Sequence, residues 1–148
     1  MTAPRPEIQV TTLQTTNDPV WQLLADQRVD LKEQVKFYNP NHLHELHTRT
    51  LLVAQLDNIV VGLTVLHNNA SNHENALGVG YVSTHKKYQN MGVASAMVKA
   101  LFMHAQLTGK AIANSPYELD GQIYLQPVME RTSNRFPTVE FVERDYSF

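Results

Sequence analysis

Short runs of apolar residues, several of them alternating with polar ones, predict six strands. At the start of the chain, Ile8, Val10 and Thr12 alternate with polar neighbours, which is the two-residue period of a half-buried strand. Only Asp57 and Asn58 separate the second run from the third, and both residue types tolerate the positive φ of a tight turn. In chain order, the predicted strands span 7–14, 51–56, 59–66, 77–84, 110–114 and 138–142.

Helical spacing and helix-start signals predict four helices. Asp18 can cap a first helix, and Pro19 suits its first position. Asp30 is expected to start a second helix, where Glu33 would complete a capping-box-like arrangement. The third and fourth helices are predicted within 91–107 and 121–135, and Pro127 should either kink the fourth helix or begin it.

The third predicted helix is apolar on most of its circumference, so it should pack against a sheet. Gly109 is placed to end it before the fifth strand. A strand, a crossover helix and a second strand make a unit whose strands run parallel. The second to fourth strands form a meander, and the polar segment 68–75 should be an exposed loop between two of them. The element order therefore predicts a mixed sheet covered by helices.

Composition agrees with one compact domain, which we expect to span residues 1–148. Apolar residues make up 43% of the chain and charged residues 18%, which is ordinary for a globular protein. A formal net charge of -2 gives no overall attraction for nucleic acid or anionic lipid, so any anion site must be local. We therefore expect neither a nucleic-acid partner nor a membrane partner.

Cysteine is absent, which excludes disulfides, thiolate metal ligands and a cysteine nucleophile. The first residues lack the apolar core of a signal peptide, and no apolar run is long enough to cross a bilayer. We therefore expect a cytoplasmic protein.

The segment 89–94 is the strongest functional signal in the chain. It lies between a predicted strand and a predicted helix, and the first N–H groups of a helix, together with its dipole, favour an anion. Gly92 lets a ligand approach where a Cβ would block it, although it could also serve only as a turn before the helix. The run Gln89-Asn90-Met91-Gly92-Val93-Ala94 resembles the acyl-CoA motif of the GNAT acetyltransferases, which reads Gln or Arg, two residues, Gly, one residue, and Gly or Ala.

The order of the predicted elements resembles the GNAT fold over nearly the whole chain. The resemblance implies an α/β (α+β) acyl-CoA acyltransferase fold, with a central mixed, mostly antiparallel sheet of about six to seven strands flanked by about four helices. It also implies that the parallel fourth and fifth strands splay apart to admit acyl-CoA. Gly78 and Gly80 fit a bulge or a close backbone approach in the fourth strand, although such glycines also occur in weakened or edge strands.

The resemblance also implies acetyl-CoA as co-substrate and indicates where it would bind. Its pyrophosphate would contact backbone N–H groups of the segment 89–94, and the Ser95 hydroxyl could add a contact. Its pantetheine would run along the end of the fourth strand, where a backbone N–H would also stabilise the tetrahedral oxyanion. The implied cofactor-binding residues are Val82, Ser83, Thr84, Gln89, Asn90, Met91, Gly92, Val93, Ala94, Ser95 and Asn114.

The reaction that the resemblance implies is acetylation of a primary amine. Since there is no cysteine, direct attack of the amine on acetyl-CoA in a ternary complex is the natural mechanism. Tyr124, with Tyr117 in reserve, is the candidate catalytic acid that protonates the departing thiolate; the alternative is a packing role. The chain departs from the family here, because 124–131 reads Tyr-Leu-Gln-Pro-Val-Met-Glu-Arg and lacks the usual Gly-Phe ending.

Two histidines are candidates for a general base that would deprotonate the amine. His67 ends the third predicted strand and His85 follows the fourth, and either could equally be a surface or core histidine. An acceptor that arrives partly neutral needs no dedicated base. With Lys86 and Lys87, His85 also forms a small positive patch that could meet the 3′-phosphate of coenzyme A or simply be solvated.

The segment 42–47, His-Leu-His-Glu-Leu-His, has spacings that could bring metal ligands together on a helix. It lacks the His-Glu-x-x-His order of a helical zinc hydrolase. A solvated helix or a wall of the acceptor pocket is the alternative that we favour, so we predict no metal.

Three hypotheses follow for the whole chain. The first is an acetyl-CoA-dependent N-acetyltransferase that acts on an amine-bearing small molecule or peptide, as a monomer or as a homodimer. The second is a catalytically inactive GNAT-like module that binds acyl-CoA or another protein. The third is a different phosphate-binding βα protein such as a nucleotide binder, but the segment 89–94 matches neither the P-loop nor the GxGxxG pattern.

Overall fold

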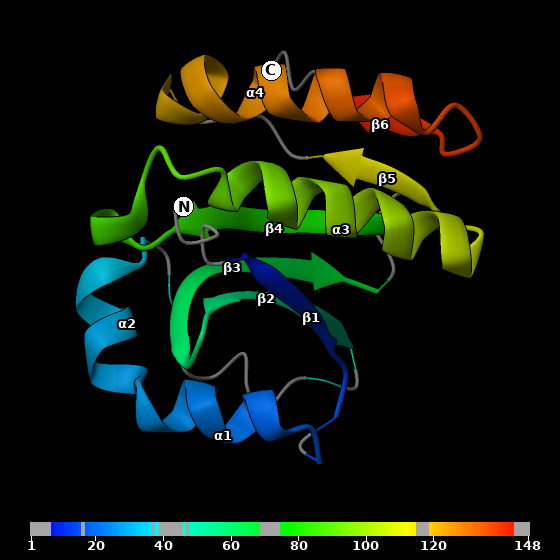
Figure 1. The fold of residues 1–148 in the computed structure, drawn as a ribbon. Coiled ribbons are helices and arrows are strands. Elements are labelled where there is room, and N and C mark those ends of the chain that lie inside the picture. Colours follow the sequence, from blue (N-terminus) through cyan, green and yellow to red (C-terminus); the bar gives the residue numbers. More distant parts are fainter. Residues whose placement is uncertain are drawn as a thin grey trace, which may run out of the picture.

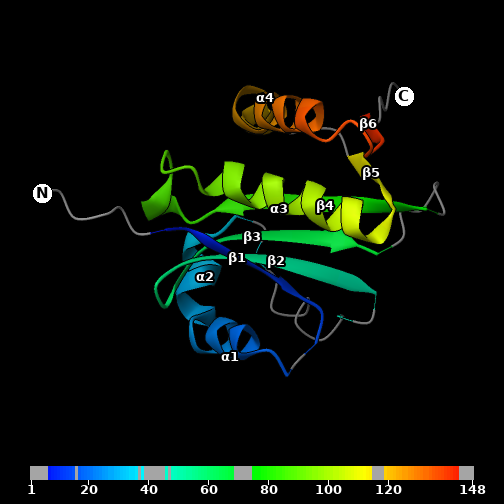
Figure 2. The same ribbon diagram turned by 45° about the vertical axis from the view of Figure 1, so that its right-hand side comes forward.

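The computed structural model of the 148-residue chain describes residues 7–15, 17–36, 38, 46, 48–68, 75–114 and 119–143. At residues 114, 119–124 and 143 it describes the backbone alone. Figure 1 shows the arrangement of the elements, and Figure 2 shows it from a second direction.

In the described part of the chain, six strands form one sheet in the order β1-β2-β3-β4-β5-β6. Neighbouring strands from β1 to β4 are antiparallel, whereas β4, β5 and β6 run parallel to one another. The strands are β1 (Gln9–Leu13), β2 (Arg49–Leu56), β3 (Ile59–His67), β4 (Ala76–Thr84), β5 (Ala111–Asn114) and β6 (Phe141–Glu143).

Helices cover both faces of this sheet (Figures 1 and 2). Successive residues of β2 face opposite sides, as the pleat of a strand requires. Accordingly, Leu51 packs in a core cluster with α1 and α2, and Leu52 packs in a separate cluster with α3 and α4. The described α-helices are α1 (Pro19–Asp26), α2 (Arg28–Gln34), α3 (Val93–Thr108) and α4 (Leu119–Arg135), and a short 3-10 helix, η2, spans Lys86–Tyr88.

The predicted element order is confirmed, and so are two helix ends. Asp18 caps α1, because its side chain accepts a hydrogen bond of 2.9 Å from the Val20 N–H. Pro19 is the first residue of that helix. Gly109 directly follows the last residue of α3 and adopts the left-handed conformation that commonly ends a helix.

The prediction that Asp30 starts the second helix is wrong. The helix α2 begins at Arg28, so Asp30 lies inside its first turn and makes no capping box. Gln27, at the start of the helix, makes no side-chain cap because its amide is used elsewhere: it donates to the Asn58 carbonyl (2.6 Å) and accepts from the Val60 N–H (3.0 Å). The start of α2 is therefore set by contacts with the β2–β3 turn.

Two boundaries near the end of the chain also differ from the prediction. Pro127 does not begin α4, since the helix starts eight residues earlier at Leu119 and contains it. Pro127 is exposed, so solvent can reach the carbonyl that its missing N–H leaves unbonded. The last strand begins at Phe141 rather than at residue 138, because Val139 donates a hydrogen bond back to the Phe136 carbonyl in a turn.

The predicted opening between the fourth and fifth strands is confirmed. Among the described residues, β5 pairs with β4 only from Ala76 to Val79, and β4 continues to Thr84 beyond the end of β5. The opening begins at a bulge, because Leu66 of β3 pairs with Val79 and Val65 pairs with Tyr81, which leaves Gly80 unpaired. Gly80 therefore marks the bulge that the sequence allowed.

The N-terminal end of α3 is held close to β3 at this same opening. A Cβ at Gly62 would lie 2.7 Å from Val93 Cγ1 and 2.8 Å from Met97 Cε, distances that real Cβ atoms do not tolerate. Gly62 thus permits the first turn of α3 to approach the sheet. Within the described residues, no helix is long and apolar enough to cross a membrane.

Candidate active site

The loop before α3, which we call the donor loop (residues 89–92), presents an open helix N-terminus. Asn90 and Gly92 have positive φ values of 64° and 82°, so the backbone turns sharply into the helix. Gly92 occupies the cap position and makes no side-chain cap. The first bond into the helix runs from the Ala96 N–H to the Gly92 carbonyl (3.0 Å), which leaves the N–H groups of 93–95 without an intrahelical partner. This end of α3 can therefore receive an anion.

The surroundings of Gly92 at this helix end are open. Nothing lies within 4 Å of the position that a Cβ would take at Gly92. The predicted pyrophosphate residues divide between exposed and buried side chains. Ser95 and the donor loop are exposed, Ala94 is half-buried, and Val93 is buried in the core, so Val93 could offer a ligand only its backbone.

The predicted pantetheine residues lie on the part of β4 beyond the bulge. Val82 packs toward α3, the Ser83 side chain is buried, and Thr84 is half-buried. Their backbone lies on the stretch that has no β5 partner. Asn114 is the last residue of β5 and pairs with Val79, next to the bulge. The structure thus brings the residues predicted on β4, on β5 and in the donor loop to one opening.

The candidate acids can be placed only in part. Tyr124 lies in α4, and its side chain is outside the described atoms. Tyr117 and most of the segment 42–47 are outside the described residues as well. Within the described ranges, no three His, Asp or Glu side chains gather to hold a metal ion.

His85 occupies an interior position and is engaged through both ring nitrogens. Its side chain is 2% exposed. Nδ1 accepts a hydrogen bond of 3.1 Å from the Lys87 N–H, and Nε2 lies 2.8 Å from Asp30 Oδ2. In a neutral ring the proton must therefore be on Nε2, where it is donated to the carboxylate. This geometry does not favour His85 as a general base, and of the predicted positive patch only Lys86 and Lys87 are exposed.

His67, the other base candidate, lies on the α1–α2 side of the opening. It ends β3 opposite Arg49 and Gly78 and is half-buried. Its Nε2 lies 3.5 Å from the position of a Cβ at Gly80, so its ring reaches the bulge. This position keeps His67 close to the place where β4 and β5 diverge.

Sequence reasoning missed a pair of tyrosines near the bulge. The extra residue Gly80 reverses the alternation of β4, so Tyr81 faces the α1–α2 side while Val79 and Val82 both face α3. Tyr81 and Tyr38 pack against the same core cluster. The sequence carries no signal for this direction, because large residues at 77, 79 and 81 alternate regularly with glycine, and only the register with β3 reveals the extra residue.

Both phenols are held in the neutral form. Burial raises the pKa of Tyr81, the nearby Tyr38 phenol raises it further, and Arg49 opposes the shift. Burial also raises the pKa of Tyr38, against the opposing charge of Arg28. The buried Tyr38 hydroxyl has no hydrogen-bond partner among the described residues. A hydroxyl of this kind can still bond to a bound molecule.

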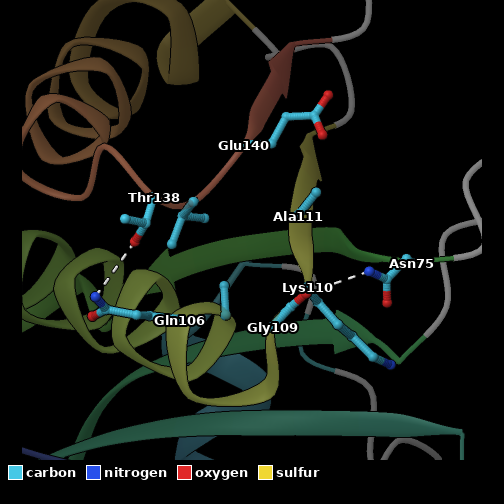
Figure 3. A pocket seen from close by; sticks show the side chains of 9 residues that line it. Asn75, Gln106, Gly109, Lys110, Ala111, Thr138 and Glu140 are labelled. Atoms are coloured by element: carbon cyan, nitrogen blue, oxygen red, sulfur yellow. Dashed lines mark hydrogen bonds between the residues drawn. The ribbon is translucent and has the colours of Figure 1, made fainter.

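A separate cleft of about 310 Å³ lies at the opposite end of α3 from the donor loop. Several of its polar side chains are engaged with one another or with backbone: Asn75 donates to the Gly109 carbonyl (3.3 Å), and Gln106 donates to the Thr138 hydroxyl (3.5 Å). Figure 3 shows Lys110 and Glu140 pointing in opposite directions. The cleft offers no converging polar groups, so it is a weaker candidate for the site than the β4–β5 opening.

The acetyltransferase (GNAT) family model matches residues 17–114, which is more than half of the chain. The chain therefore belongs to the GNAT acetyltransferase family. This confirms the resemblance that the segment 89–94 indicated. No curated protein sequence matches the chain significantly.

Solved structures share the fold at low sequence identity. A ribosomal-protein-alanine N-acetyltransferase from Brucella melitensis biovar Abortus 2308 is 13% identical, with a TM-score of 0.60 over 96% of each chain. An aminoglycoside acetyltransferase from an uncultured soil metagenomic sample is 16% identical, with a TM-score of 0.59 over 95% of each chain. A GNAT family acetyltransferase from Elizabethkingia anophelis with acetyl-CoA bound is 18% identical, with a TM-score of 0.55 over 81% of this chain and 72% of that one. These similarities confirm the predicted mixed sheet with its splayed parallel pair.

Proposed function

We propose that the protein is an acetyl-CoA-dependent N-acetyltransferase that transfers an acetyl group to a primary amine. The observation that carries the proposal is the uncapped N-terminus of α3, which opens beside the unpaired end of β4. Family membership supports it, as does the Elizabethkingia anophelis relative of the same fold, which has acetyl-CoA bound. The proposal also includes that the chain forms a single domain, that the protein is located in the cytoplasm and that it can form a homodimer.

Acetyl-CoA would lie across the opening. Its pyrophosphate would accept hydrogen bonds from the N–H groups of the donor loop and of residues 93–95, with the exposed Ser95 hydroxyl beside them. Its pantetheine would follow the backbone of 82–84, and Asn114 would contact it from β5. The thioester would then reach the bulge at Gly80.

The reaction would proceed in one ternary complex. The neutral amine nitrogen attacks the thioester carbon, and a backbone N–H of β4 stabilises the oxyanion that develops. The C–S bond then breaks and the acetyl group stays on the nitrogen, which releases one proton to water to become the amide, while the thiolate takes a proton. We assign this proton to Tyr124; an unchanged turnover rate for Tyr124→Phe would remove that assignment.

The acceptor amine would approach from the α1–α2 side. Tyr81 and His67 face that side at the bulge, and the buried Tyr38 hydroxyl packs into the same core cluster behind them. The solved relatives of this fold include one named for a ribosomal-protein alanine and one named for aminoglycosides. Small molecules and peptides therefore both remain within the proposal.

Thermal unfolding with and without nucleotides tests the donor half. Acetyl-CoA should raise the melting temperature, because a ligand that binds only the folded state stabilises it by about 2.7 kcal/mol at a hundredfold excess over its Kd. ATP and NAD serve as controls that carry phosphates without the thioester. A shift with ATP or NAD, and none with acetyl-CoA, would favour the nucleotide-binding alternative instead.

Activity separates an enzyme from an inactive acyl-CoA-binding module. The missing Gly-Phe ending after Tyr124 is the feature that motivates the inactive alternative. A panel of amines, including amino acids, peptides, polyamines and aminoglycosides, should reveal release of free coenzyme A with one acceptor class. Binding of acetyl-CoA with neither transfer nor hydrolysis across the panel would support the inactive module.

A further inference from the structure

A single side-chain contact joins the helix α2 to the segment that leads into the donor loop. Asp30 lies in α2, and His85 follows β4 immediately before η2. The two residues are 55 positions apart in sequence, and their Oδ2 and Nε2 atoms are 2.8 Å apart. Figure 1 shows α2 beside the segment between β4 and α3. The contact therefore connects the α1–α2 side of the opening with the segment that leads into the donor loop.

Other contacts join His85 to β3 and to η2. Its backbone N–H donates to the Val61 carbonyl of β3 (2.8 Å), and its carbonyl accepts from the Tyr88 N–H (2.9 Å). Its Nδ1 caps η2 by accepting a hydrogen bond from the Lys87 N–H. The rings of His85 and Tyr88 pack edge to face, with their centroids 5.1 Å apart. The ring direction thus depends on η2, which continues directly into the donor loop.

In contrast, the side chains of α2 itself make few other contacts, although the Gln27 amide just before the helix bonds to the β2–β3 turn. The helix has seven residues, and only Leu31 among them is buried. Within the described part of the structure, the Asp30–His85 contact is the one side-chain hydrogen bond that leaves these seven residues. The Asp30 side chain is 48% exposed, so the contact is reached by solvent and can open. A change in how firmly His85 is held should therefore change how well α2 is ordered.

We infer that Asp30 and His85 are positioning residues that transmit the occupancy of the acetyl-CoA site to α2, on the acceptor side. The inference rests on the proposed function, because it needs acetyl-CoA to bind at the donor loop. An anion there would hold the loop and η2 still, which keeps Nε2 of His85 directed at the carboxylate and so orders α2. By linkage, an acceptor that needs an ordered α2 then binds better once acetyl-CoA is bound, and acetyl-CoA binds better in its presence.

Hydrogen exchange of backbone amides tests this without knowledge of the acceptor. In the wild type, acetyl-CoA should slow exchange in two segments, 86–96 and 28–34, with an effect on α2 of about fivefold or more, the lower range of measured couplings. In Asp30→Ala the slowing should persist at 86–96 and be lost at 28–34. Asp30→Asn should behave as the wild type, because its amide oxygen still accepts the Nε2 proton.

Two further variants serve as controls for charge and for the histidine. Glu33→Ala removes an acid from the same helix at an exposed position and should keep the slowing of α2. His85→Asn keeps an acceptor near the Lys87 N–H but is too short to reach Asp30, so it should lose the slowing of α2 as Asp30→Ala does. Agreement between these two disruptive variants excludes a purely local effect on α2.

Two results would overturn the inference while leaving the proposed function intact. One is equal slowing of 28–34 in the wild type and Asp30→Ala. The other is slowing at 86–96 alone in the wild type. If acetyl-CoA slows exchange in neither segment, the proposed function fails, and this inference fails with it.

Discussion

Gly92 and Gly109 stand at opposite ends of α3 and share a left-handed backbone conformation, with φ values of 82° and 69°. At both positions a Cβ would meet no atom within 4 Å, so the strain of any other residue comes from the backbone alone. They differ in their surroundings, because Gly92 belongs to the donor loop and Gly109 borders the remote cleft. At the scale of a residue, the same conformation thus opens the helix N-terminus at one end, where we propose that acetyl-CoA binds, and terminates the helix at the other.

Gly92→Val should abolish the acetyl-CoA-dependent rise in melting temperature. The substitution costs about 1–3 kcal/mol of backbone strain and places a branched side chain in the ligand's path. Gly109→Val is the matched control, since it imposes the same kind of strain far from the loop and should keep the rise. Titration of both variants with acetyl-CoA, followed by calorimetry, measures the difference; equal loss of binding in both would contradict a role for the loop.

The neutral tyrosines near the bulge predict a loss of stability in alkali. Burial raises the pKa of Tyr81 in the folded state above its ordinary 10.0, so above about pH 10 the unfolded state loses a proton that the folded state keeps. The folded state then binds more protons, and the free energy of unfolding falls as pH rises. Tyr81→Phe should show a smaller fall in urea titrations above that pH, and an unchanged slope would count against a buried neutral phenol.

At the scale of an element, packing between α3 and β3 fixes where the donor loop lies. Gly62 leaves room for Val93 and Met97 from the first turns of the helix. The terminal methyl of Met97 can move aside, whereas the branched Val93 has few other rotamers. The position of the donor loop therefore depends on Gly62, a glycine within β3.

Gly62→Ala should destabilise the protein by about 1–3 kcal/mol and weaken acetyl-CoA binding, because the added Cβ pushes the start of α3 off the sheet. Val93→Ala should relieve part of this cost when combined with it. Denaturant unfolding of the two single variants and the double variant gives the coupling energy. If the changes in unfolding free energy of the two single variants simply added up in the double variant, there would be no steric contact between the two positions.

At the scale of the whole molecule, one aromatic cluster ties the β5–β6 region to the rest. Phe102 of α3 is fully buried, and its ring lies 5.8 Å from that of Phe136 and 5.6 Å from that of Phe141. Phe136 follows α4 and Phe141 begins β6. The cluster therefore joins α3, α4 and the last strand into one core.

Phe102→Ala should lower the free energy of unfolding by about 3–5 kcal/mol, the usual cost of removing a buried aromatic ring. Leu107→Ala is the control on the same helix, because Leu107 is 85% exposed and should cost no more than about 0.5 kcal/mol. Thermal and chemical unfolding measure both variants. A cost for Phe102→Ala as small as that of the control would show that the last elements do not share the core.

Local signals in the sequence were enough to predict the order of the strands, two helix ends and the turn that forms the donor loop. Asp18, Gly92 and Gly109 act on neighbouring backbone within a few residues, so their effect can be read without the rest of the fold. The family motif is local in the same sense, since the segment 89–94 lies wholly within one turn and the start of one helix.

Only the tertiary structure decided features that join distant segments. Asp18 and Asp30 look alike in sequence, yet one caps a helix and the other binds a histidine 55 residues away. The bulge at Gly80 turned Tyr81 toward Tyr38, a direction that depends on the register with β3. The sequence by itself thus determined the family, the element order and the turn of the donor loop through short-range patterns. The fold decided which side chains meet, because burial and strand register depend on contacts across the whole chain.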